Sequence, residues 1–151
     1  MPSSVRRCLA HRTATLLLTL PALALASTAP ASAANTGTIR ADSATLNSAG
    51  QAVVRLTYTC TQGTDLTDTP PGGVVQVEQD ARGVLGHQTF TALCDGRPHT
   101  TTVRVNATTP GGRDADYAPG EAQVTVSLTH YDFEQDAFVG FAAEDSAYTL
   151  S

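Results

Sequence analysis

Residues 51–60, Gln-Ala-Val-Val-Arg-Leu-Thr-Tyr-Thr-Cys, decide the fold class of this chain. The even positions from Ala52 to Cys60 are apolar, whereas the odd positions include an arginine and two threonines. An alternation with period two predicts a β-strand that has one face in the core and the other toward solvent. The stretches 101–107 and 122–129 alternate in the same way, so they predict two further strands.

Weaker alternation and turn-forming residues outline the rest of the fold. The weaker strand candidates are Thr38–Leu46, Val74–Gln79, Gln88–Cys94 and Glu144–Leu150, and the predicted turns are Asn47–Gly50, Pro70–Gly73, Asp95–Pro98 and Pro110–Gly120. No stretch of 11 or more residues has apolar positions at helical spacing, and threonine and valine dominate the periodic stretches. We therefore expect an all-β fold, a single antiparallel β-sandwich of about seven strands.

The first 33 residues have the pattern of an export signal. Three arginines precede the apolar run Leu16–Ala26, and Ala31-Ser32-Ala33 is a small-residue cleavage site. The alternative is a transmembrane anchor, but a bilayer-spanning helix needs about 20 apolar residues and this run is much shorter. We expect residues 1–33 to be a cleaved signal peptide and residues 34–151 to form one domain, secreted as a soluble protein.

The charge of residues 34–151 excludes two classes of partner. The leader holds three of the nine basic residues, which leaves six arginines, no lysine and all fourteen acidic residues, a net charge of −8. Binding to DNA or RNA through counterion release needs a basic surface, so nucleic acid is excluded, and anionic membranes are disfavoured for the same reason.

Two cysteines remain after the leader is removed, Cys60 and Cys94. In an oxidising compartment they predict one intramolecular disulfide, which would close a loop of about 35 residues and contribute roughly 3 to 4 kcal/mol. The alternative is a pair of free thiols that act as metal ligands or as a redox pair. No second ligand pair with zinc-ribbon spacing accompanies them.

Three short motifs resemble those of small secreted actinobacterial proteins of uncharacterised families with an immunoglobulin-like sandwich. They are Tyr58-Thr59-Cys60-Thr61, Cys94-Asp95-Gly96-Arg97 before His99, and Gly120-Glu121-Ala122. The resemblance implies an immunoglobulin-like fold and an extracellular location, but no assigned reaction. The chain departs from true immunoglobulin domains because it has no tryptophan, and Cys94 falls at the end of the predicted fourth strand. Its composition is also similar to that of the apoproteins of enediyne antibiotics, which bind a chromophore, but those proteins use two short-range disulfides.

Motifs of catalysis are missing from the sequence. It contains neither a G-x-S-x-G elbow nor an H-E-x-x-H zinc motif, and no glycine-rich phosphate loop follows a predicted strand. His87, His99 and His130 stand far apart, and surface or core-rim roles are the expectation for them. We expect no enzymatic activity and no cofactor.

The carboxylates Asp132, Glu134 and Asp136 alternate in a way that could supply calcium ligands. The EF-hand pattern fails, however, since Ala137 stands where that loop needs glycine and Ala143 where it needs glutamate. A solvated acidic loop is the alternative interpretation, and we expect no metal site.

Four of the eight aromatic residues, Tyr131, Phe133, Phe138 and Phe141, lie within 11 positions. Loops at the end of a sandwich often form binding surfaces, and exposed aromatic rings supply rigid contact area. One hypothesis is therefore a binding site for an extracellular protein or a small ligand. The other is that these rings close the open end of the core, or that the stretch Phe138–Phe141 starts the last strand.

The function that we expect is a secreted, monomeric, non-enzymatic binding or cell-envelope module. The alternative is a small secreted protease inhibitor, although inhibitors of this length usually carry two disulfides.

Overall fold

The computed structural model describes residues 34–63, 69–133 and 135–151, and the predicted signal peptide lies outside them. The described residues form two antiparallel sheets packed as a β-sandwich, and their only helical segment is the short 3₁₀ turn η1 (Asp80–Arg82). The predicted fold class is therefore confirmed, with nine strands in place of about seven. The strands are β1 (Thr36–Leu46), β2 (Ala52–Thr61), β3 (Gly72–Gln79), β4 (Val84–Thr91), β5 (Asp95–Val105), β6 (Ala107–Thr108), β7 (Asp114–Ala115), β8 (Gly120–Asp132) and β9 (Ala137–Leu150).

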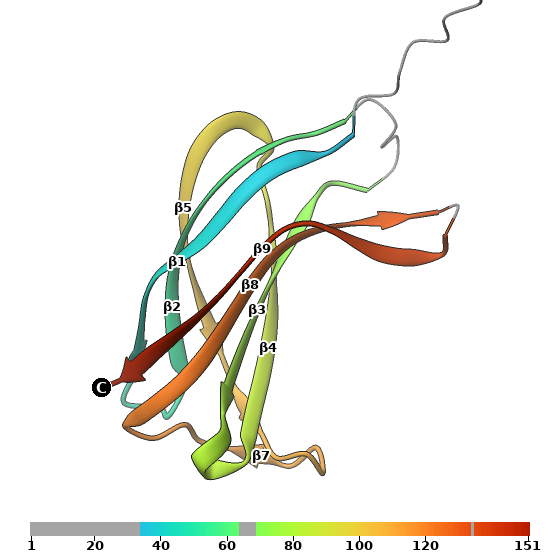
Figure 1. Ribbon diagram of the computed structural model, residues 1–151. Helices are drawn as coiled ribbons and strands as arrows, with labels where there is room; N and C mark the ends of the chain where they lie inside the picture. The colour runs from blue at the N-terminus through green and yellow to red at the C-terminus, as the bar shows by residue number, and fades with distance from the viewer. Residues whose placement is uncertain (1–33, 64–68, 134) are drawn as a thin grey trace, which may run out of the picture. The chain divides into compact units, whose positions relative to one another are not determined.

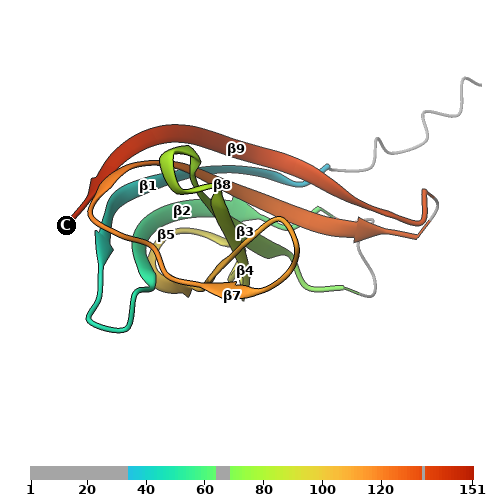
Figure 2. The ribbon, with the colours of Figure 1, turned by 90° about the horizontal axis from the view of Figure 1, so that it is seen from below.

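The two sheets have the strand orders β1-β2-β5 and β7-β6-β4-β3-β8-β9. Figure 1 and Figure 2 show β8 and β9 as one long hairpin whose turn projects beyond the neighbouring strands. The core lies between the sheets, where alternate residues of β2, β3 and β8 turn inward. Its fully buried members include Val54, Leu56, Val75, Val77, Val105, Val124, Val126, Leu128 and Leu150.

The disulfide between Cys60 and Cys94 is present, with 4.5 Å between the Cα atoms. Cys60 belongs to β2, and Cys94 immediately precedes β5, the hydrogen-bonded neighbour of β2. The bond therefore joins β2 to the residue that leads into its neighbour β5, and it does not bridge the two layers. The prediction that Cys94 ends the fourth strand was wrong, because β4 stops at Thr91.

Two predicted turns also proved to be wrong. Residues Asp95–Pro98 belong to β5, where Pro98 pairs with Thr59 of β2. β5 is an edge strand, so only one of its sides pairs with another strand. Proline, which has no N–H to donate, is tolerated at such an edge. The register shifts next to this pair, and Gly96 there adopts a φ of 79°, so the strand continues through a bulge.

The predicted turn at Pro70–Gly73 is the second correction. Gly72 and Gly73 begin β3 and pair with both β4 and β8. The ring of Phe90 explains Gly73, because a Cβ at this position would lie 2.1 Å from its Cζ atom. This glycine is therefore a packing requirement of the sheet and not a turn signal.

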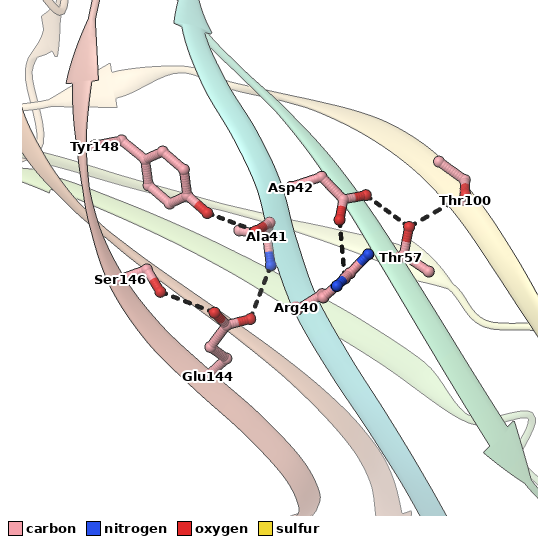
Figure 3. A network of polar contacts seen from close by, with 8 residues as sticks. All are labelled: Arg40, Ala41, Asp42, Thr57, Thr100, Glu144, Ser146 and Tyr148. Carbon is pink, nitrogen blue, oxygen red and sulfur yellow. Dashed lines mark hydrogen bonds and ion pairs between the residues drawn. The ribbon is translucent and has the colours of Figure 1, made fainter.

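Edge strands of the two sheets meet along one side of the sandwich (Figure 3). The carboxylate of Glu144 in β9 accepts a hydrogen bond from the backbone N–H of Ala41 in β1, at 3.0 Å, and another from the hydroxyl of Ser146. The hydroxyl of Tyr148 donates to the carbonyl oxygen of Ala41, at 2.5 Å. These contacts occupy main-chain groups at the free edge of β1, which would otherwise be open to pairing with another chain.

Candidate functional site

The turn of the β8–β9 hairpin brings three of the four predicted aromatic residues together. Tyr131 of β8 pairs with Phe138 of β9, and Phe133 lies in the turn between the strands. The side chains of Phe133 and Phe138 are 65% and 75% exposed. Phe141 is separate from them, since it packs partly buried against the core with its ring 6.0 Å from that of His130.

Both parts of the alternative interpretation apply to different rings. Phe141 packs against the core, and Phe138 is the second residue of β9, the last strand. Phe138 nevertheless keeps three quarters of its surface in solvent, so its position in a strand leaves it accessible.

The ring of Tyr131 lies at the centre of the exposed cluster. Its centroid is 5.0 Å from that of Phe133 and 5.2 Å from that of Phe138, with interplanar angles of 73° and 76°. Such edge-to-face contacts hold aromatic rings in a defined geometry. We call these three residues the aromatic trio.

A carboxylate holds the central ring in place. The hydroxyl of Tyr131 donates a hydrogen bond to Asp136, a residue with a φ of 50° in the hairpin turn. This bond, together with partial desolvation, raises the pKa of the Tyr131 phenol. Tyr131 therefore remains a neutral phenol with its hydroxyl directed at the carboxylate.

Beside the trio lies a groove of about 610 Å³. It is lined by Thr69, Pro70, Gly72, Gly73, Val74, Thr89, Phe90, Thr129, His130, Tyr131 and Phe138. The lining comes from four adjacent strands, β4, β3, β8 and β9, and from the segment that leads into β3. It contains no charged carboxylate, lysine or arginine.

Register explains why a hollow forms there. Residues directly opposite one another in an antiparallel pair project to the same face of the sheet. Gly72 pairs with Thr129, two residues before Tyr131, and these positions alternate with the buried Gly73 and Leu128. The groove therefore opens on the face of the six-stranded sheet that is turned away from the core, and Gly72 leaves its floor without a side chain.

The walls of the groove come from longer side chains on either side of this glycine. Val74 pairs with Thr89 at one end, while Tyr131 and Phe138 stand at the other. The hydroxyl of Thr69 donates to the carbonyl oxygen of Tyr131, which connects the segment before β3 to β8.

The calcium candidates have other interactions in this structure. The carboxylate of Asp132 accepts hydrogen bonds from the backbone N–H and side-chain amide of Gln135, and Asp136 accepts one from Tyr131. Glu134 lies outside the described residues. Within those residues no group of three potential metal-ligating side chains occurs.

The three histidines occupy separate places. His99 contacts Asp95 at 2.7 Å, and this hydrogen bond is the main cause that lowers the pKa of Asp95. His87 pairs with Gln76 on the exposed face of β4. His130 contributes to the groove, and its buried Nδ1 atom has no hydrogen-bond partner in the described structure.

Sequence reasoning found the aromatic wall and missed the hollow beside it. The available signal was the pair Gly72 and Gly73 between Pro71 and a run of valines, which is unusual inside a strand and marks close approach of another group.

Comparison of the chain with protein-family models, with curated proteins and with solved structures found no match. In the part of the chain that the structure describes, no helix has the length and apolar character required of a membrane span.

Proposed function

We propose that this protein is a secreted, non-enzymatic binding module that holds a small ligand in the groove beside the aromatic trio. The observation that carries the proposal is a concave site of about 610 Å³ with an exposed aromatic wall. Sites for small molecules typically measure 300 to 1,000 Å³ and combine apolar walls with a few polar groups. Here the polar groups are the hydroxyls of three threonines, which suit orientation of a ligand.

The extracellular location is part of the same proposal. One disulfide in a chain with two cysteines after the leader is typical of an oxidising compartment, and the basic and apolar N-terminal segment favours export. The strand order also favours an immunoglobulin-like classification. Strands β1, β2 and β5 correspond to A, B and E of that fold, and β3, β8 and β9 to C, F and G.

A neutral aromatic probe tests the groove. Titration of the ¹⁵N-labelled protein with N-acetyltryptamine, followed by two-dimensional NMR, is expected to shift the amides of Gly72, Gly73 and Thr129. The variant Gly72→Leu should abolish these shifts, because its side chain would occupy the floor of the groove. Gly111→Leu is the matched control, since the Cβ there would have no atom closer than 3.9 Å. Absence of shifts at the groove, or shifts that persist in Gly72→Leu, would exclude this site.

A second candidate function, inhibition of an extracellular protease, is favoured by Leu93. Its side chain is 59% exposed on the short connection between β4 and β5. The disulfide at Cys94 braces this connection, and the backbone N–H of Leu93 donates to the Tyr58 hydroxyl at 3.2 Å. Inhibitors need such a braced segment, because a rigid loop binds a protease with less loss of conformational entropy. Stoichiometric inhibition of subtilisin that disappears in Leu93→Asp would support this function, and unimpeded cleavage would exclude it.

A further inference from the structure

The charge around the groove narrows the chemistry of its ligand. The segments that line it, residues 69–74, 89–90 and 129–138, contain three acidic residues and no lysine or arginine. Of the two that the structure describes, Asp132 ends β8 and Asp136 lies in the hairpin turn next to the aromatic trio. The carboxylate of Asp136 is bonded to the Tyr131 hydroxyl, and no described arginine forms an ion pair with it.

The aromatic trio adds a second attraction for positive charge. The face of an aromatic ring carries the negative part of its quadrupole, so a cation within about 6 Å of the ring centroid is attracted to it. Tyr131 and Phe138 stand 76° apart and line the groove, and Phe138 is largely exposed. Two rings at this angle offer a cation contacts from two directions.

The hydrogen bond of the Tyr131 hydroxyl also favours a cation over the Tyr131 ring. Its hydroxyl donates to a carboxylate, which increases the electron density of the ring. An anionic ligand would lie near this ring and the carboxylate bonded to it, with no lysine or arginine in the lining to offset the repulsion. The floor and far wall, formed by Gly72, Val74 and Thr89, fit an apolar body.

We propose that the ligand of this groove is a small organic cation, an ammonium group attached to an apolar body. This inference rests on the proposed function of the groove as a ligand site. The ammonium group contacts the faces of Tyr131 and Phe138, and Asp136 contributes negative charge behind them. The apolar body lies along β3, over Gly72.

Three indoles of equal body and different charge test this inference. Tryptamine is a cation at neutral pH, N-acetyltryptamine is neutral and indole-3-propionate is an anion. Because the chain has no tryptophan, indole fluorescence excited at long wavelength reports the probe alone. We expect tryptamine to bind about three- to tenfold more tightly than N-acetyltryptamine, and indole-3-propionate to bind more weakly than both.

Two variants separate cation–π contact from diffuse charge attraction. Phe138→Leu and Tyr131→Leu keep an apolar wall but remove the aromatic face, so the preference for tryptamine should fall toward onefold while N-acetyltryptamine still binds. Leu93→Ala, an exposed apolar residue outside the groove, is the control and should keep the preference. The preference should also survive in 0.5 M salt, because long-range attraction is screened there and close contacts are not.

The outcomes distinguish this inference from the proposed function. If N-acetyltryptamine and tryptamine bind the groove equally, the ligand is not selected by charge and the cation inference fails, while the proposed function stands. If neither probe shifts the groove amides, both fail. A tryptamine preference that remains unchanged in both leucine variants would overturn the assigned role of the aromatic rings.

Discussion

Replacement of Gly73 by alanine tests the packing that forms the groove. The added Cβ would lie 2.1 Å from Cζ and 2.2 Å from Cε1 of Phe90, far inside contact distance. The Phe90 ring must therefore move by more than 1 Å, although it also packs against Tyr58 at a centroid distance of 5.6 Å. Overpacking of this kind costs about 1 to 3 kcal/mol, and loss of the aromatic pair adds to it.

A smaller gain opposes this cost. Alanine restricts the unfolded chain more than glycine does, which is worth about 0.4 to 1 kcal/mol. We expect Gly73→Ala to lower the free energy of unfolding by about 2 kcal/mol and the melting temperature by about 8 °C. Urea unfolding followed by far-ultraviolet circular dichroism measures the first quantity, and a thermal scan the second.

The neighbouring glycine supplies the matched control. A Cβ on Gly72 would approach the Phe90 carbonyl oxygen at 3.3 Å, which needs only a small adjustment. Gly72→Ala should therefore change stability by no more than about 0.5 kcal/mol. The double variant Gly73→Ala/Phe90→Ala should lose less than the sum of its single variants, because the new methyl group enters the space of the ring. Equal effects of the two glycine variants, or strict additivity in the double variant, would refute this account of the packing.

Three further predictions concern stability. Replacement of Cys60 and Cys94 by serine should cost about 3 to 4 kcal/mol, because the bond closes a sequence separation of 34 residues, and urea unfolding of both forms measures the loss. Burial raises the pKa of Tyr117 to about 12, so its neutral form stabilises the fold fully below about pH 10, and this stability is lost as the pH rises from 10 to 12. Stability curves of the wild type and of Tyr117→Phe should therefore converge over that range, and parallel curves would contradict the shift. Glu144→Ala should cost about 1 to 2 kcal/mol, since it leaves a backbone N–H of β1 without its partner, whereas Ser146→Ala, which keeps that bond, should cost less.

The aromatic part of the site could be predicted from the sequence, whereas the groove beside it could not. The concentration of aromatic residues between Tyr131 and Phe141 indicated a contact surface, and three of the four rings do lie together. Alternation places Phe138 and Phe141 on opposite faces of β9, because they are three positions apart. Only the register shift next to Leu128 decides that Phe141 is the one that packs against the core. Nothing in the alternation of β8 reveals that shift.

Local sequence determined the elements and the chemistry of their faces. Alternation in residues 52–60 and 122–128 set which side chains are buried, since a strand presents successive residues to opposite faces whatever its neighbours are. Only two cysteines follow the predicted signal peptide, so a single pairing was possible between them. The buried faces depend on a few consecutive residues, and the disulfide pairing depends on the number of cysteines.

Tertiary structure decided everything that requires two distant strands to meet. The groove exists because Gly72 is in register with Thr129, 57 positions later, and the edge of β1 is covered because Glu144 reaches Ala41 across a separation of 103. The alternating pattern of each strand is compatible with many partners and registers. Only packing of the two sheets around one core selects among them, because a shift of one residue would turn the apolar face outward.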